Sequence, residues 1–118
     1  MAAAAIFVGW GQIVRGREAK ALGVFNETLA YYTRLQQEGT IESFEPVLLG
    51  AHGGELAGFI LIRGERSKLD TLKTTEEFTR TTFRANLIVD NLGVVDASIG
   101  ATLTTGMATF AAQIAELT

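Results

Sequence analysis

At 118 residues, 47 % apolar and 19 % charged, the chain suits one domain, residues 1–118, with enough apolar material for a core. Its net charge of −3 and its lack of Lys/Arg runs argue against nucleic acid as a partner. Without cysteine and with one histidine, the chain excludes disulfides, thiolate metal sites and any site that needs two histidines, so we expect no metal and no cofactor.

The chain begins with eleven apolar residues. Met1–Gly11 has no basic segment before the apolar run and is too short to span a bilayer. We therefore expect no membrane association, a cytoplasmic location, and a disordered alanine tip that leads into a strand. The strand is predicted over Ala5–Val14, where β-branched and aromatic residues dominate. Gly9 and Gly11 share one face, which indicates a close approach to the backbone there.

A helix is expected next, over Glu18–Glu38. One apolar stripe recurs along it at spacings of three and four: Leu22, Phe25, Leu29, Tyr32 and Leu35. Gly39 is suited to end the helix, because glycine readily takes the left-handed conformation that follows many helices. Of the adjacent residues Tyr31 and Tyr32, one is expected to face the core and the other water or a partner.

A β-hairpin is predicted over Glu42–Arg63. Two runs rich in apolar residues flank Gly53 and Gly54, a pair that suits a tight reversal between antiparallel strands. Pro46 has no N–H to donate, which places the first strand at a sheet edge. The second strand is apolar on both faces and therefore suits the interior of the sheet.

A second helical region follows the hairpin. Leu69 and Leu72 give a short apolar turn, and the helix after it runs to about Ile88. Thr74 and Glu77 fit a capping box, with Thr74 as the N-cap residue.

The last part of the chain contains a strand and a helix. The strand is predicted over Leu92–Ile99 and the helix over about Thr102–Leu117. This closing helix has the clearest helical pattern of the chain, with apolar residues at Leu103, Met107, Phe110, Ile114 and Leu117. Gly106 weakens it in the middle.

The predicted order is therefore β-α-β-β-α-β-α. Right-handed crossovers fold this order into a four-stranded antiparallel sheet with helices on one face. The fold class is α+β: a ferredoxin-like sandwich with an additional C-terminal helix. Its central strands are expected to be Ile6–Val14 and Leu56–Arg63.

One face of such a sheet has no helix to cover it. An exposed apolar patch of that size usually marks an interface, so we expect a homodimer or larger assembly, packed sheet to sheet. As an alternative, the closing helix could fold back over the open face of its own sheet. Strand alternation places Ile60 and Ile62 under the helices, and it places Phe59, Leu61 and Arg63 on the open side. Trp10 is expected on the open, partner-facing side as well.

Two segments make the chain resemble the dimeric α/β-barrel superfamily, which includes stress-responsive barrel proteins and small antibiotic-biosynthesis-type monooxygenases. The first segment is Ile13–Glu18, where a strand leads into a helix. The second is Gly58–Glu65, followed by Leu69, Leu72 and the pair Glu77-Phe78. The resemblance extends over residues 5 to 100. It implies a barrel formed by two subunits and a small hydrophobic pocket, and it implies no particular chemistry, because fold does not carry function.

Several residues are candidates for a site. His52 could act as a general base or, with Glu55, as a metal ligand, although a solvent-exposed position at the hairpin tip is the alternative. Trp10 and Gln12 could line a ligand pocket, or Trp10 could serve packing alone. The candidates for ligand binding are Trp10, Gln12, Arg15, Arg17, Tyr32 and His52.

Arg15 and Arg17 precede a helix N-terminus, and with the free N–H groups there they could hold an anion. A solvated turn is the alternative. The residues show no P-loop pattern, no Ser-His-Asp arrangement and no pair of catalytic carboxylates.

Two hypotheses follow for function. The first is a homo-oligomeric domain without catalytic machinery that binds a small apolar or weakly acidic molecule. The second is a cofactor-independent enzyme of the monooxygenase or isomerase type, with a pocket between the sheet and the helices. An enzyme would need a positioned acid or base facing that pocket, and this feature distinguishes the two.

Overall fold

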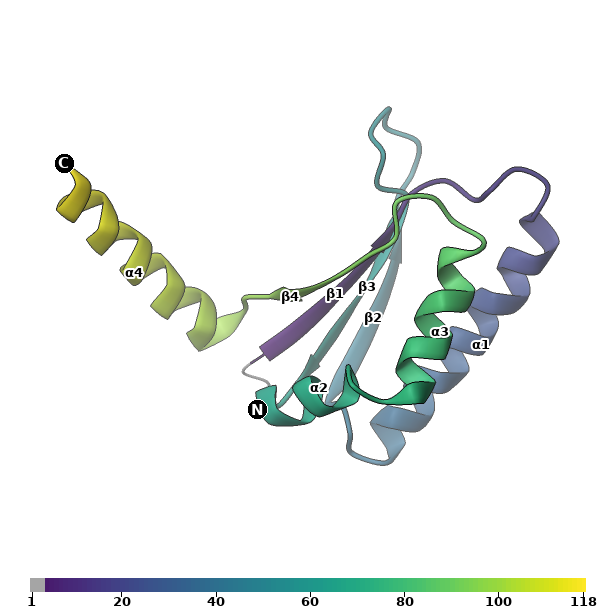
Figure 1. Cartoon of the computed structure of the whole chain (residues 1–118), viewed down its shortest axis with the longest axis horizontal. Helices are drawn as coiled ribbons and strands as arrows, with labels where there is room; N and C mark the ends of the chain where they lie inside the picture. The colour runs from purple at the N-terminus through teal and green to yellow at the C-terminus, as the bar shows by residue number, and fades with distance from the viewer. Residues whose placement is uncertain (1–3) are drawn as a thin grey trace.

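The computed structural model describes residues 4–118, and the expected disordered alanine tip falls on residues 1–3, outside that range. The elements are β1 (Ala4–Trp10), α1 (Glu18–Gln37), β2 (Ser43–Leu48), β3 (Gly58–Gly64), α2 (Arg66–Leu72), α3 (Glu76–Asn86), β4 (Gly93–Ala97) and α4 (Gly100–Leu117). The strands form one antiparallel sheet in the order β2-β3-β1-β4. Helices α1, α2 and α3 lie on one side of it (Figure 1). This confirms the ferredoxin-like α+β sandwich with β1 and β3 at its centre.

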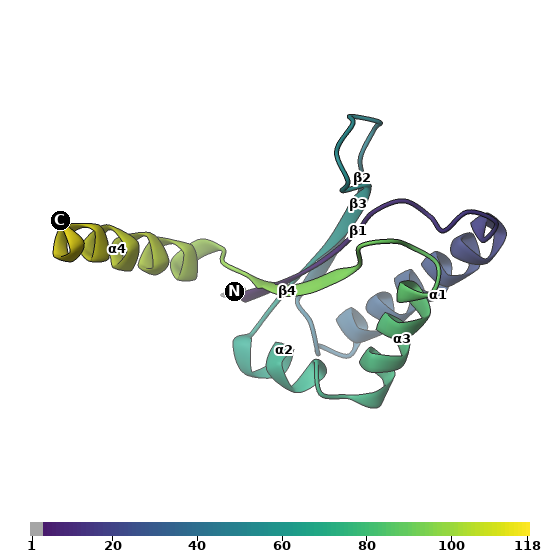
Figure 2. The same cartoon turned by 45° about the horizontal axis from the view of Figure 1, so that its top comes forward.

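Strand alternation sorts the side chains between the two sides of the sheet. Ile6 lies opposite Ile62, and Val8 lies opposite Ile60; all four are buried beneath the helices. The other side, which we call the open face, carries Phe7, Phe59, Leu61, Arg63 and Val95. No helix lies over this face (Figure 2). The sides predicted for Ile60, Ile62, Phe59, Leu61 and Arg63 are thus confirmed.

The open-face position expected for Trp10 is wrong. Trp10 continues the alternation of Ile6 and Val8 to the helix side, where its ring centroid lies 6.1 Å from that of Phe25 in α1. Gly58, which lies opposite Trp10 in the register, leaves room for the ring. A Cβ at residue 58 would lie 2.8 Å from the indole carbon Cζ2, closer than side chains tolerate.

The first strand is shorter than predicted, because β1 ends at Trp10 and not at Val14. Backbone pairing nevertheless continues beyond it. The Gly11 N–H donates to Asp90 O at 2.8 Å, and the Val14 N–H donates to Ile88 O at 2.8 Å. The close approach expected at Gly11 is confirmed, since a Cβ there would lie 3.0 Å from the Asp90 carbonyl oxygen.

The predicted hairpin is confirmed, with β2 at the sheet edge and β3 inside. Its connection is a longer loop, residues 49–57, and not a tight turn at the two glycines. Gly39 follows the end of α1 with a φ of 81°, as expected for a helix stop.

Three expectations about the helices need correction. Thr75, and not Thr74, caps α3: its hydroxyl oxygen accepts the Phe78 N–H at 3.3 Å. Tyr31 and Tyr32 are both buried, so neither faces water. Leu22, expected in the buried stripe of α1, is 63 % exposed, because α1 turns Ala21 and Val24 inward instead.

Helix α4 extends away from the rest of the described chain (Figure 1; Figure 2). None of its side chains is buried. The radius of gyration is 16.2 Å, against about 13 Å for a compact domain of this length. Within one chain α4 therefore does not fold back over its own sheet, contrary to the alternative considered above. No helix among residues 4–118 has both the length and the apolar character to cross a membrane.

Candidate functional site

The apolar core is divided into two clusters. The larger one lies between the sheet and the helices and includes Ile6, Val8, Ile60 and Ile62. The smaller one consists of Ala21, Val24, Ile88 and Val89, from α1 and the segment after α3. Trp10 and Leu92 are partly buried and pack against both clusters. The helices and the sheet thus leave a gap between the two clusters.

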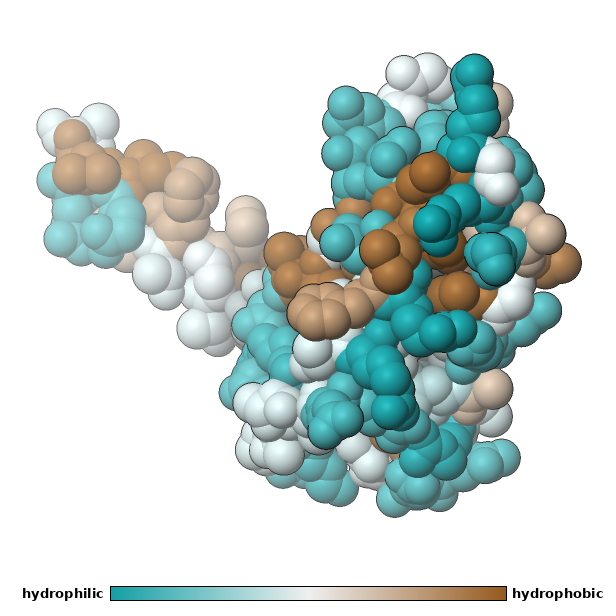
Figure 3. Space-filling model, turned by 45° about the vertical axis from the view of Figure 1, so that its right-hand side comes forward, coloured by the Kyte–Doolittle hydropathy of each residue, from teal (hydrophilic) through white to brown (hydrophobic). Residues whose placement is uncertain are grey.

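A cavity of about 240 Å³ occupies this gap. Its lining comes from the sheet, α1, α3 and the segment that follows α3: Val8, Trp10, Ile13, Glu18, Ala21, Leu22, Val24, Phe25, Thr28, Leu48, Ile60, Ala85, Ile88, Val89 and Leu92. Val8, Val24 and Ile60 are buried members of this lining, while Leu22 and Leu48 are more than half exposed. The cavity therefore has a buried floor and an open apolar rim. Hydrophobic side chains gather on this side of the molecule (Figure 3).

Two aromatic rings form part of the cavity wall. The rings of Trp10 and Phe25 meet edge to face, with an interplanar angle of 67°. This arrangement is favourable for aromatic pairs, and it brings a strand and a helix together at the cavity. Gly58 supports it by leaving space behind the indole. Trp10 is the only tryptophan of the chain, so its fluorescence comes from this cavity alone.

The cavity offers few polar groups. The Thr28 hydroxyl donates to the Val24 carbonyl oxygen at 2.8 Å and is thereby engaged within α1. Glu18 is exposed at the rim, where its carboxylate accepts the Gly16 N–H at 3.3 Å. The lining includes no lysine, arginine or histidine. The lining therefore offers mainly apolar contacts and no cationic group.

Of the six residues predicted to bind a ligand, Trp10 alone lines this cavity. Gln12, Arg15 and Arg17 are exposed in the connection between β1 and α1. Arg17 borders a separate shallow hollow with Lys20 and Arg84. The connection pairs with the segment that follows α3 through Gly11 and Val14. Within it Ile13 lines the cavity, whereas Gln12, Arg15 and Arg17 do not.

Tyr32 and His52 do not line the cavity, and both make contacts within the chain instead. Tyr32 is 2 % exposed, and its ring lies 5.8 Å from that of Phe44, centroid to centroid. His52 is exposed in the loop between β2 and β3. Its Nδ1 accepts the Gly54 N–H at 3.2 Å, and its Nε2 lies 2.7 Å from the Leu56 carbonyl oxygen. Both contacts fit the neutral tautomer protonated at Nε2, which ties the loop to itself.

A second, more polar hollow of about 500 Å³ lies between the end of α1, α2 and the start of α3. Three of its charged groups form ion pairs, since Arg34 bonds to Glu77 and lies 3.7 Å from Glu38, while Lys68 donates to the Gly39 carbonyl oxygen at 3.2 Å. Arg34 also lies 5.4 Å from the centre of the Tyr31 ring. This mutual neutralisation lowers the pKa of Glu77, chiefly through the hydrogen bond from Arg34. The hollow therefore offers no free charge from this ion pair to a ligand.

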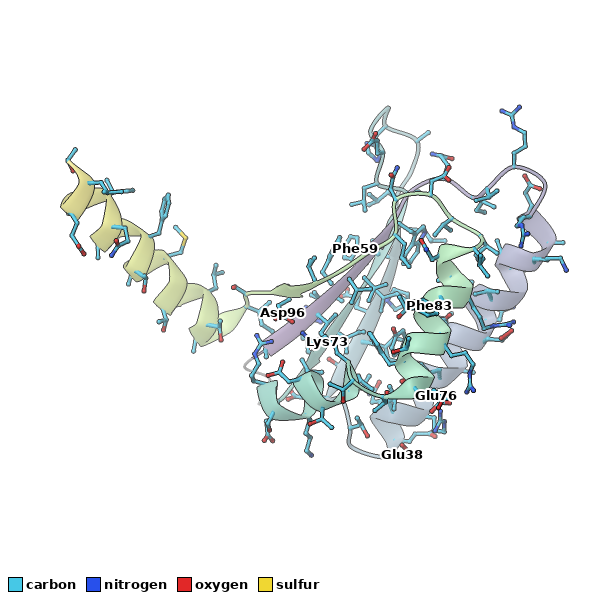
Figure 4. The ribbon with its side chains drawn as sticks, viewed as in Figure 1. Glu38, Phe59, Lys73, Glu76, Phe83 and Asp96 are labelled. Carbon is cyan, nitrogen blue, oxygen red and sulfur yellow. The ribbon has the colours of Figure 1, made fainter. Side chains whose placement is uncertain are left out.

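An ion cluster joins α2 to the edge strand β4. Lys73 Nζ lies 2.7 Å from Asp96 Oδ1, and Arg66 approaches the same oxygen to 3.4 Å (Figure 4). The hydrogen bond from Lys73 is the main cause that lowers the pKa of the Asp96 carboxyl. These charges are substantially exposed, so the cluster orients β4 and adds little to stability.

Most cavity residues were missed by reasoning from the sequence. Phe25 was assigned to the buried stripe of α1, without a link to Trp10. Val24 and Ala21 lie just beside that stripe. Ile88 and Leu92 flank the end of a predicted helix. A signal was present in the sequence, since these residues are apolar and close to expected element ends, but only the packing of α1 against α3 brings them to one place.

The fold and the cavity define the class of protein as a ferredoxin-like α+β domain with an apolar pocket under its sheet. The structure is similar to that of a dimeric protein of unknown function and ferredoxin-like fold from Bacteroides fragilis NCTC 9343, with a TM-score of 0.60 and 12 % identity. The similarity covers 82 % of this chain and 97 % of that one.

The structure is also similar to an antibiotic biosynthesis monooxygenase, with a TM-score of 0.53 and 21 % identity over 81 % of this chain and 98 % of that one. The fold resemblance predicted from the sequence is thereby confirmed. The sequence matches no protein-family profile, and no curated protein matches it. Both structural neighbours are covered almost completely, so this chain carries nearly a fifth of its length beyond what either shares.

Proposed function

We propose that this protein is a homo-oligomeric binding protein whose cavity takes up a small, neutral, apolar molecule. The observation that carries the proposal is the cavity between the two core clusters, with Trp10 and Phe25 in its wall and Leu22 and Leu48 at its rim. Binding sites for small molecules are typically concave and mostly apolar, with a few polar groups.

The size of the cavity supports a ligand built around one aromatic ring. An apolar cavity of about 150 Å³ binds benzene, and the cavity here measures about 240 Å³. The ligand is expected to be neutral, because a carboxylate would find no cation in the lining and would face Glu18. A weakly acidic ligand, which the sequence left open, is therefore less well supported than an apolar one.

Self-association is the second part of the proposal. The open face presents Phe7, Phe59, Leu61 and Val95, and Val95 is 56 % exposed. Contiguous exposed apolar surface of this kind is typical of interaction sites. The structural neighbour from Bacteroides fragilis is described as dimeric, which supports the same arrangement here.

Catalysis is less well supported than binding. An enzyme acting in the cavity would need a positioned acid or base. Glu18 is the one ionisable residue of the lining, and it is exposed at the rim with its carboxylate turned to the Gly16 N–H.

Fluorescence quenching tests the binding proposal. Bromobenzene is small, neutral and a heavy-atom quencher, so its entry into the cavity should quench Trp10 emission in a saturable manner. 4-Bromobenzoate, which has the same ring and bromine but carries a charge, should quench only weakly and without saturation.

Two variants localise the effect to the cavity. Ala21→Leu fills the buried side of the cavity and should abolish the saturable component. Ala30→Leu makes the same change at an exposed position of α1 and should leave it intact. Bromobenzene quenching that is linear in concentration, or equally strong in Ala21→Leu, would show that the cavity binds nothing.

A further inference from the structure

Helix α4 carries an apolar surface that no other element of residues 4–118 covers. Five large side chains form one line along it, which we call the α4 stripe: Leu103, Met107, Phe110, Ile114 and Leu117. Each of them is between 48 % and 87 % exposed. The positions step by four and three residues, so they lie on one side of the helix. The only charged residue of α4 is Glu116.

A helix of this kind is not stable in water by itself. Most helical stability in proteins comes from the packing of an apolar side and not from intrinsic propensity. Gly106 and the threonines of α4 weaken the helix further. The existence of α4 as a helix therefore implies a surface against which the stripe packs.

The open face of the sheet is also an apolar surface. Phe7 pairs with Leu61 on one side and with Val95 on the other, and its ring stacks on that of Phe59 with centroids 5.3 Å apart. Arg63 and Glu45 pair with each other at 3.4 Å toward the rim of this face. The centre of the open face is thus apolar, as the α4 stripe is.

These two surfaces do not meet within one chain, because α4 extends away from its own sheet (Figure 2). A second copy carries both of them. If two copies are related by a two-fold axis, the contact of one stripe with the partner's open face is made twice. A membrane surface fits α4 less well, because interfacial helices carry a strongly charged side rich in Lys and Arg, and α4 has neither residue.

We propose that α4 is an exchanged arm: in a dimer, the α4 stripe of each copy packs on the open face of the other. The proposal rests on the self-association proposed above and specifies how it occurs. It places α4 on the partner's sheet and thus replaces the direct sheet-to-sheet packing expected from the sequence. Both unpartnered apolar surfaces of the chain are then covered at once.

Site-directed cross-linking tests the exchanged arm, and the chain is suited to it because it contains no cysteine. Met107→Cys places a thiol in the α4 stripe, and Leu61→Cys places one at the centre of the open face. The two variants are co-expressed with different affinity tags, purified as the mixed species and treated with a short bis-maleimide. Thr105→Cys, on the opposite side of α4, replaces Met107→Cys as the matched control.

The proposal expects a covalent dimer carrying both tags from Met107→Cys with Leu61→Cys, and several-fold less from Thr105→Cys with Leu61→Cys. Cross-linking of Met107→Cys purified alone, with none in the mixed species, would show that the two α4 helices pair with each other and would overturn the proposal. Cross-linking of Leu61→Cys purified alone, with none in the mixed species, would overturn it in favour of direct sheet contact. A chain carrying both substitutions that cross-links at monomer mass would overturn it in favour of fold-back.

A second measurement separates this inference from the proposed function. Phe110→Glu, in the stripe, should raise the dimer dissociation constant at least about tenfold, because a charge would be buried in an apolar contact. Thr109→Glu, on the other side of α4, should leave it unchanged. A dimer unaffected by Phe110→Glu overturns the exchanged arm and leaves self-association standing, while saturable quenching of Trp10 tests ligand binding independently of both.

Discussion

Gly58 determines where the largest side chain of β1 can lie. Trp10 stands opposite Gly58, and only a residue without Cβ leaves room for the indole on that side of the sheet. The ring then reaches Phe25 and forms the cavity wall. One missing side chain on β3 thus positions the aromatic pair that makes the cavity.

A substitution at Ile60 tests which side of the sheet lies beneath the helices. Ile60 is 1 % exposed and lines the floor of the cavity. Ile60→Ala should lower the free energy of unfolding by about 2–5 kcal/mol, through the lost burial and the enlarged void. Urea unfolding at fixed protein concentration measures it. The neighbouring change Leu61→Ala, on the open face, should lower fold stability less, and equal effects would contradict the assignment.

Tyr32 makes the stability of the fold depend on pH in the alkaline range. Burial raises the pKa of the Tyr32 hydroxyl above its ordinary value, with a smaller contribution from Tyr31. Above a pH of about 10 the unfolded chain loses this proton while the folded chain keeps it. The stability contribution is therefore complete below that pH and is lost as the pH rises further.

Tyr32→Phe should accordingly reduce the fall in melting temperature between pH 8 and pH 11. It should not abolish the fall, because burial also raises the pKa of Tyr31. Thermal melts of the variant and the parent protein at both pH values provide the comparison. An identical fall in the two proteins would show that Tyr32 ionises as it does in the unfolded chain.

Helical periodicity and strand alternation predicted much of the fold. They failed where the position of a side chain depends on a residue in another strand or helix. The alternation of β3 correctly placed Ile60 and Leu61 on opposite sides. The side of the sheet predicted for Trp10 was wrong, because that side depends on the register between β1 and β3, which places Gly58 opposite Trp10. A hydrophobic pocket was expected from the resemblance, but the residues that line the cavity were not predictable, since a gap between packed elements leaves no periodic pattern in the sequence.

At the scale of elements, α3 shows how one hydroxyl fixes a helix start. Two adjacent threonines were both able to cap it. Thr75 has the extended backbone of an N-cap residue and accepts the Phe78 N–H, while the Thr74 hydroxyl donates to the Thr71 carbonyl oxygen at 2.6 Å. Which of the two threonines caps α3 depends on where the turn after α2 ends. The capping pattern in the sequence does not specify that position.

Replacing each threonine in turn distinguishes their roles. Thr75→Ala should lower the free energy of unfolding by about 1 kcal/mol, as expected for a lost N-cap. Thr74→Ala should stay within about 0.5 kcal/mol of the parent, because it removes only an exposed hydrogen bond within a turn. Chemical denaturation of both variants measures the difference, and a larger effect for Thr74→Ala would restore the cap predicted from the sequence.

At the scale of the whole molecule, the described chain is longer than a compact domain of its size. Its extents are 52 × 38 × 23 Å, and α4 accounts for the extension (Figure 1). The cavity and the open face lie on opposite sides of the sheet, so the proposed ligand binding and the proposed association involve separate surfaces.

Association itself is measurable directly. Light scattering at micromolar concentration should give at least twice the chain mass of 12.7 kDa, because the open face and the α4 stripe are both apolar and uncovered in one chain. Dilution should lower the mass toward that of the monomer. A mass of 12.7 kDa throughout the accessible concentration range would contradict self-association in any form.

The direction in which α4 leaves the sheet depends on handedness at a single residue. Gly100 begins the helix with a φ of 53°, and the space where its side chain would lie is empty. An L-amino acid would therefore meet no obstacle there and would still disfavour this backbone by about 1–2 kcal/mol, purely because of its chirality. The direction of α4, on which the proposed exchange depends, is thus favoured by a residue whose side-chain position touches no other part of the described chain. A substitution at this position would therefore strain the start of α4 without adding a side-chain contact to the sheet.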